Sequence, residues 1–73
     1  MVSTRQFVVT PSGLMEGWAV RCDGQTLSTH FTQGEAMVEA SYQAELQAQR
    51  DRVRAEVYLH TRDGRFRETR RYG

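Results

Sequence analysis

Residues 55–71, AEVYLHTRDGRFRETRR, decide the fold of this chain. Two runs of alternating apolar and polar residues flank Asp63-Gly64, a dipeptide typical of a two-residue type I′ turn between antiparallel strands. The pattern predicts strands over residues 55–62 and 65–71. In this register Arg62 lies opposite Arg65, and His60 lies opposite Arg67.

The predicted hairpin sorts its side chains onto two faces. The buried face holds Ala55, Val57, Leu59, Thr61 and Phe66, and the open face holds Tyr58, His60, Arg62, Arg65 and Arg67. Like charges directly opposite each other destabilise a sheet slightly, and a visiting anion would relieve this cost. We therefore expect the open face to bind an anion, most plausibly nucleic acid, with Tyr58 stacking on a base. The alternative is a solvated face whose charges protect the sheet from aggregation.

A helix is predicted before this hairpin. Thr32-Gln33-Gly34-Glu35 has the pattern of a capping box, in which the Thr32 and Glu35 side chains each bind the other residue's backbone amide. The helix should run to about Arg50. Its core face carries Ala36, Met37, Ala40, Ser41, Ala44 and Ala48. Small residues every four positions let a helix lie close to a sheet.

A second apolar line on this helix, Val38, Tyr42 and Leu46, lies nearly opposite the core face. A single domain has no obvious way to bury both faces of one helix. Two interpretations stay open. The line is covered by the loop near residues 14–15 or by the C-terminal segment, or it contacts a second copy or a partner protein.

Three short strands are predicted before the helix, over residues 6–10, 18–22 and 26–31. Trp18, Val20 and Cys22 alternate toward the core, and Asp23-Gly24 supplies a tight turn. In the third strand Leu27, Thr29 and Phe31 should point inward, with Ser28 and His30 outward. The prediction is one α+β domain over residues 1–73 in the order β-β-β-α-β-β. One helix packs on one face of an antiparallel sheet.

Composition excludes several classes of protein. The chain has 73 residues and a net charge of +1, with only 14 Leu, Val and Phe residues and no Ile to build a core. No apolar run approaches the roughly 20 residues that span a bilayer, and no signal peptide is evident, so a cytoplasmic location is expected. The single cysteine, Cys22, excludes an internal disulfide and a multi-cysteine zinc site. Because the sequence contains neither a nucleophile elbow nor a glycine-rich phosphate loop, we expect no enzyme, no cofactor, no metal and no small-molecule substrate.

Three motifs occur in order along the chain: GWAVR at residues 17–21, TQGEA at 32–36 and HTRDGR at 60–65. Together they resemble the small prokaryotic domain-of-unknown-function family 2188, whose members share a G-W-x-V strand, a T-x-x-E-A helix start and an H-x-x-D-G-R or K hairpin. The likeness covers roughly residues 7–68. This chain differs from the family pattern in two places: the segment over residues 24–32 is shorter, and the segment over residues 44–60 is longer. The resemblance implies a compact bacterial α+β module and supplies no catalytic residue.

The sequence thus predicts a small non-enzymatic module that contacts an anionic partner, most plausibly nucleic acid, through its basic hairpin. The alternative is a protein-interaction or homodimerising module that uses Val38, Tyr42 and Leu46.

Overall fold

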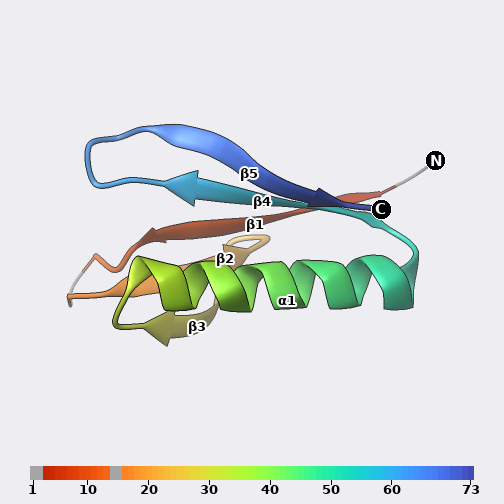
Figure 1. Cartoon of the computed structure of the whole chain (residues 1–73), viewed down its shortest axis with the longest axis horizontal. Helices are drawn as coiled ribbons and strands as arrows, with labels where there is room; N and C mark the ends of the chain where they lie inside the picture. The colour runs from red at the N-terminus through yellow and green to blue at the C-terminus, as the bar shows by residue number, and fades with distance from the viewer. Residues whose placement is uncertain (1–2, 14–15) are drawn as a thin grey trace.

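The computed structural model describes residues 3–13 and 16–73 and contains one helix and one sheet (Figure 1). The elements in chain order are β1 (Thr4–Pro11), β2 (Trp18–Cys22), β3 (Gln25–His30), α1 (Gln33–Asp51), β4 (Arg54–His60) and β5 (Phe66–Tyr72). The helix packs on one face of the sheet, and within the described residues no helix covers the other face (Figure 1). The predicted α+β class and element order are confirmed.

The sheet has the strand order β3-β2-β1-β4-β5, and β1 pairs with β4 in parallel. The predicted fully antiparallel sheet is therefore wrong. In the β1-β2-β3 meander, β1 and β3 run in one direction and only β2 runs in the other. Since α1 returns the chain to the end of the sheet where β1 begins, β4 must run the same way as β1. An antiparallel neighbour was available only beside β2, whose two edges were already paired.

The core lies between α1 and the sheet. Phe7, Val9, Val20 and Val57 are the largest side chains that are fully buried. Three helix alanines, Ala36, Ala40 and Ala44, are 0% exposed and bring the helix close to the strands. The predicted core face of the helix is thus confirmed.

Both ends of α1 are defined by side chains or backbone conformation. The Glu35 amide donates to Thr32 Oγ1 at 3.1 Å and the Thr32 amide donates to Glu35 Oε1 at 3.2 Å, so the predicted capping box is present. Arg52 adopts the left-handed conformation, with φ +53°, and ends the helix. The Arg5 guanidinium on β1 donates to Asp51 at 2.8 Å, which fastens this last turn to the sheet.

The predicted facing of β3 is wrong. His30 lies opposite Trp18 and Ser28 lies opposite Val20, so both point to the helix side of the sheet. Leu27 and Phe31, which were expected to point inward, are 45% and 91% exposed. The reason is a bulge between Val20 and Arg21, which shifts the pairing of β2 and β3.

Candidate anion-binding site at the hairpin end

The turn between β4 and β5 differs from the predicted two-residue turn. The Thr61 amide donates to the Arg65 carbonyl at 2.8 Å, and the Gly64 amide donates to the Thr61 carbonyl at 3.0 Å. Gly64 has a φ of +90°, whereas Asp63 does not adopt a positive φ. A type I′ turn needs positive φ at both positions. The loop is instead a three-residue connection that ends in a glycine bulge.

Asp63 explains why the longer loop forms. Its carboxylate accepts a hydrogen bond from the Thr61 hydroxyl and another from the Arg65 amide at 3.4 Å. These two donors, the Thr61 hydroxyl above all, lower the pKa of Asp63 below its ordinary value. The carboxylate thus bridges the two ends of the loop while the φ of Asp63 itself stays negative.

The longer loop moves the β5 residues nearest the turn by one position. Phe66 lies opposite His60 and Arg67 lies opposite Leu59. A bulge between Val57 and Tyr58 then restores the predicted register at the far end, where Glu56 lies opposite Arg71. The predicted pairing is therefore wrong near the turn and right beyond the bulge.

Phe66 lies on the uncovered face of the sheet, not in the core as predicted. Its ring stacks on Tyr58 with 4.9 Å between centroids and 10° between planes, and it meets His60 edge-on at 6.0 Å. Phe66 is 56% exposed. Tyr58 and His60 lie on the open face, as predicted, so the structure adds a third ring to them.

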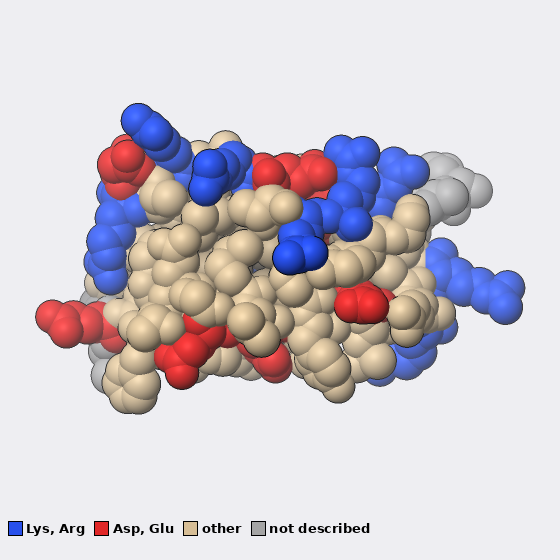
Figure 2. Space-filling view, viewed as in Figure 1, with Lys and Arg blue, Asp and Glu red and all other residues tan. Residues whose placement is uncertain are grey.

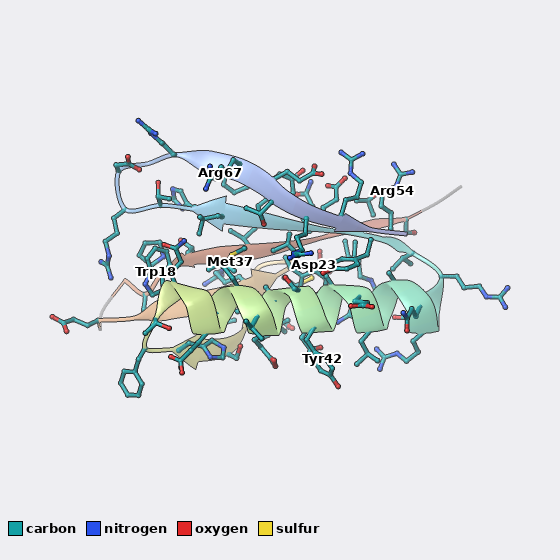
Figure 3. The ribbon with its side chains drawn as sticks, viewed as in Figure 1. Trp18, Asp23, Met37, Tyr42, Arg54 and Arg67 are labelled. Atoms are coloured by element: carbon teal, nitrogen blue, oxygen red, sulfur yellow. The ribbon has the colours of Figure 1, made fainter. Side chains whose placement is uncertain are left out.

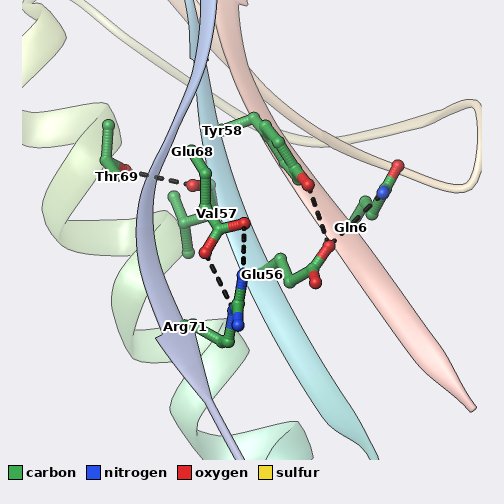
Figure 4. Close-up of polar contacts among 7 residues, drawn as sticks. All are labelled: Gln6, Glu56, Val57, Tyr58, Glu68, Thr69 and Arg71. Carbon is green, nitrogen blue, oxygen red and sulfur yellow. Dashed lines mark hydrogen bonds and ion pairs between the residues drawn. The ribbon is translucent and has the colours of Figure 1, made fainter.

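Polar contacts hold two of these rings in place. The Tyr58 hydroxyl donates to Glu56 at 2.9 Å, and the Gln6 amide donates to the same carboxylate oxygen at 3.4 Å (Figure 4). The hydrogen bond to Glu56 raises the pKa of Tyr58 above its ordinary value. His60 Nδ1 lies 3.1 Å from Thr10 Oγ1 on the neighbouring β1. Of the three neighbouring rings, Tyr58 and His60 are therefore held in place by polar contacts with the sheet, and Phe66 packs against both.

The three predicted arginines do not share the open face with these rings. Arg67 lies opposite Leu59, which places it on the helix side of the sheet. The Arg62 guanidinium lies over the Trp18 ring, 5.5 Å from its centroid, and Arg65 pairs with Asp63 at 3.4 Å. The expected single basic face is wrong. The one-position shift inverts the side-chain alternation of β5 and turns Arg67 to the helix side, whereas Arg62 lies in the loop between β4 and β5.

The arginines nevertheless meet in one open hollow at the turn end of the hairpin. It is lined by Trp18, Gln33, Thr61, Arg62, Asp63, Arg65, Phe66 and Arg67. Arg67 on β5 and Trp18 on β2 lie at the same end of the molecule (Figure 3). We call Arg62, Arg65 and Arg67 with Trp18 and Phe66 the hairpin-end site. Trp18, which the alternation of its strand predicted to be a core residue, both packs against the core and lines this hollow.

The charges of the hairpin-end site are partly free. Arg62 and Arg67 are exposed, and neither forms an ion pair with a carboxylate of the described residues. Arginine side chains gather along the edge formed by the β4–β5 hairpin (Figure 2). Two guanidinium groups can therefore accept an anion without first giving up an ion pair to a described carboxylate, although Arg62 also lies over the Trp18 ring.

The single thiol of the chain is buried. Cys22 is 8% exposed, and burial together with the nearby Asp23 raises the pKa of its thiol. In residues 3–13 and 16–73, no group of three or more His, Cys, Asp or Glu side chains is placed to hold a metal ion. No helix in the described part of the chain is long and apolar enough to cross a membrane.

The second apolar line of α1 is uncovered. Val38, Tyr42 and Leu46 are 71%, 59% and 37% exposed, so the C-terminal segment does not bury them. The other suggested cover, Leu14 and Met15, lies outside the described residues. We call Val38, Tyr42 and Leu46 the helix stripe.

Fold and site define a small α+β module with a mixed five-stranded sheet, one helix and arginines clustered at one hairpin end. A family described as "Uncharacterized protein conserved in bacteria (DUF2188)" matches residues 6–72. The chain therefore belongs to this family, as the three sequence motifs indicated. No curated protein and no solved structure matches it.

Proposed function

We propose that this protein is a non-enzymatic module that binds an anionic partner, namely single-stranded nucleic acid, at the hairpin-end site. The observation that carries the proposal is the position of two guanidinium groups, Arg62 and Arg67, in the same hollow as the exposed ring of Phe66; neither guanidinium forms an ion pair within the part of the chain that the structure describes. Cationic groups that neutralise phosphates next to a ring that stacks on bases are what single-strand binding requires.

The two chemical features of the site play different roles in this proposal. Arg62 and Arg67 bind phosphate oxygens with paired N–H donors, and Arg65 joins them although it also pairs with Asp63. Phe66 extends the stacked Tyr58 ring toward the hollow and offers its free face to a base. Bases in a duplex are stacked and cannot reach such a ring, so a single strand is the favoured ligand.

The small net charge and the few phosphate contacts limit the affinity of this site for nucleic acid. The net charge is only +1, so long-range attraction to a polyanion is weak. Two or three phosphate contacts give a salt slope of about −1.4 to −2 in log K against log salt for single strands. Binding should therefore be measurable at low salt and weak at physiological salt.

The test is a fluorescence anisotropy titration of labelled single-stranded and duplex oligonucleotides at low salt. The double variant Arg62→Ala/Arg67→Ala should bind the single strand at least tenfold more weakly. The matched control is Arg54→Ala/Arg70→Ala, which removes two other exposed arginines that lie away from the turn and form no ion pair with any residue whose position is described. Equal losses in both variants, or no binding by the wild type, would refute the proposal.

Phe66 provides an independent check of the stacking role. Phe66→Ala should weaken single-strand binding, whereas Phe66→Trp should retain it because the stacking surface is kept. Phe66 is solvent-exposed, so neither substitution removes a core side chain.

A second candidate function is association through the helix stripe. The observation in its favour is that Val38, Tyr42 and Leu46 remain exposed on one helix face although each is apolar or aromatic. Light scattering of the wild type and of Leu46→Glu tests it. A larger species that Leu46→Glu dissociates supports association, and a monomer in both samples argues against self-association.

A further inference from the structure

The hollow of the hairpin-end site carries more positive charge than a phosphate inside a strand would balance. Three arginines and one aspartate line it, which gives it a net charge of +2. The aspartate, Asp63, is already held by the Thr61 hydroxyl and by the amide and guanidinium of Arg65. A phosphodiester has one negative charge, whereas a terminal phosphate group carries about −1.5 to −2 at pH 7. The charge of the hollow therefore matches the end of a strand better than its interior.

Carboxylates border this hollow on the uncovered face of the sheet. Glu56 and Glu68 lie beside Tyr58, the ring on which Phe66 stacks (Figure 4). Glu68 pairs with Arg71 at 2.9 Å, but Glu56 forms no ion pair with any residue that the structure describes. The hydrogen bond to Glu56 raises the pKa of Tyr58, and the charges of Glu56 and Glu68 add to this effect. A strand that continued past Tyr58 would bring its next phosphates toward like charge.

The border of the hollow beyond Trp18 is also acidic. Trp18 lines a second hollow, which has Glu16 and His30 but no arginine among the lining residues that the structure describes. His30 in turn borders a third hollow that contains Glu35 and Glu39. Figure 2 shows the same division, with arginines along the β4–β5 hairpin and acidic side chains over α1. A strand that crossed Trp18 would therefore also bring its phosphates toward carboxylates.

The outer edge of β5 leaves one approach to the hollow open. β5 is an edge strand, and farther along it Arg70 is exposed and forms no ion pair with a described residue. A strand can therefore enter along β5, but it cannot continue across the molecule without approaching a carboxylate. Such a site accommodates a chain end more readily than a passing chain.

We infer that the hairpin-end site holds the end of a single strand by its terminal phosphate, with the terminal base stacked on Phe66. A terminal phosphate presents three oxygens, one more than a phosphodiester, to the guanidinium groups of Arg62, Arg65 and Arg67. The 5′ and 3′ ends of a strand can both carry this group, and the experiment below distinguishes them. This inference rests on the proposed function above and names the part of the nucleic acid that is bound.

Fluorescence anisotropy with four oligothymidines tests the inference at low salt. Each strand carries an internal label, which leaves both of its ends accessible. Three strands have the same length and carry a 5′ phosphate, a 3′ phosphate or neither. The fourth carries neither but is two nucleotides longer, so its total charge equals that of the phosphorylated strands. One phosphorylated strand should bind about tenfold more tightly than the longer strand, and the tighter of the two identifies the end that is bound.

Arg65→Ala tests the role of the third guanidinium. It leaves Arg62 and Arg67 in place and lowers the net charge of the hollow to +1. The preference for the phosphorylated strand should therefore fall to about threefold or less, while binding of the unphosphorylated strand changes little. The matched control is Arg54→Ala, which removes an exposed arginine at the end of β4 farthest from the turn and should keep the preference.

The outcomes separate this inference from the proposed function. If neither phosphorylated strand binds more tightly than the longer strand, the inference is wrong while single-strand binding stands. The same holds if Arg65→Ala keeps the full preference, because the dianion would then not depend on the third guanidinium. If the wild type binds none of the four oligothymidines, the inference and the proposed function are both wrong.

Discussion

Phe66 lies directly opposite His60 across the β4–β5 ladder, one position away from the partner that a two-residue Asp-Gly turn would give it. This relationship puts an aromatic ring on the open face of the sheet and turns Arg67 toward the helix side. The hairpin-end site exists because of that shift, since Phe66 and the arginines then border the same hollow from two sides.

The pairing itself can be tested with engineered disulfides. The double variant His60→Cys/Phe66→Cys should form an intramolecular disulfide, because directly opposite residues have neighbouring Cβ atoms. His60→Cys/Arg67→Cys should not, because adjacent positions on a strand point to opposite faces. Mass spectrometry after mild oxidation measures both, and the reverse pattern would support the two-residue turn.

Gly64 should be intolerant of a side chain for conformational reasons alone. A Cβ at Gly64 would meet nothing within 4 Å, but its φ of +90° is unfavourable for other residues. We expect Gly64→Ala to lower the free energy of unfolding by about 1–2 kcal/mol. Gly34→Ala, also unobstructed but in helical conformation, should raise it by about 0.5–1 kcal/mol. Urea denaturation compares them, and equal effects would argue against the left-handed Gly64.

The capping box should contribute measurably to stability. Thr32→Ala removes the acceptor of the Glu35 amide and should cost about 1 kcal/mol in unfolding free energy. Thr32→Ser keeps the hydroxyl and should cost much less. Thermal denaturation followed by circular dichroism measures the difference, and an alanine variant as stable as the serine variant would contradict the role of the cap.

The close approach of α1 to the sheet depends on its alanines. Ala40 is 0% exposed, so Ala40→Leu must displace the helix or the strands below it and should destabilise by about 1–3 kcal/mol. The control Gln49→Leu adds a similar side chain at an exposed position of the same helix and should change stability by less than about 0.5 kcal/mol. Similar losses in the two variants would show that overpacking is not the cause.

Acid should weaken the link between the end of α1 and the sheet. Hydrogen bonds from Arg50 and Arg5 lower the pKa of Asp51 below its ordinary value of 3.8 in the folded protein. A carboxyl with a lowered folded pKa contributes stability above its unfolded pKa and loses that contribution as pH falls through the folded value. As the pH is lowered through the acid range, the free energy of unfolding should therefore decrease less steeply in Asp51→Asn than in the wild type.

Chemical denaturation at a series of pH values measures those slopes. Added salt should reduce the difference between the two proteins, because exposed ion pairs are screened. The Arg5–Asp51 pair has side chains 35% and 31% exposed, so it is open to screening. Parallel pH profiles for the wild type and Asp51→Asn would exclude this ion pair as a source of stability.

Local sequence determined the elements whose signals are complete within a few residues. The Thr32–Glu35 capping box, the alanine spacing of α1 and the alternation of Trp18, Val20 and Cys22 predicted a helix start, a buried helix face and a strand face, and each is confirmed. The three family motifs are also short local patterns, each six residues long or less. In each case the deciding interactions lie within one turn of helix or one strand.

Tertiary structure decided which strands pair, in which direction and in which register. The two Asp-Gly pairs make the difference plain. Asp23 and Gly24 both take positive φ and form the predicted tight turn, whereas Asp63 is held by the Thr61 hydroxyl and the Arg65 amide and only Gly64 takes positive φ.

The same dipeptide therefore gives two different loops, and bulges in β2–β3 and β4–β5 change which side chains share a face. The sequence alone identified the basic hairpin and its residues. Their arrangement around Trp18 and Phe66 depended on long-range pairing, because a shift of one position costs little in the local turn yet moves the β5 side chains between the turn and the Val57/Tyr58 bulge to the other face of the sheet.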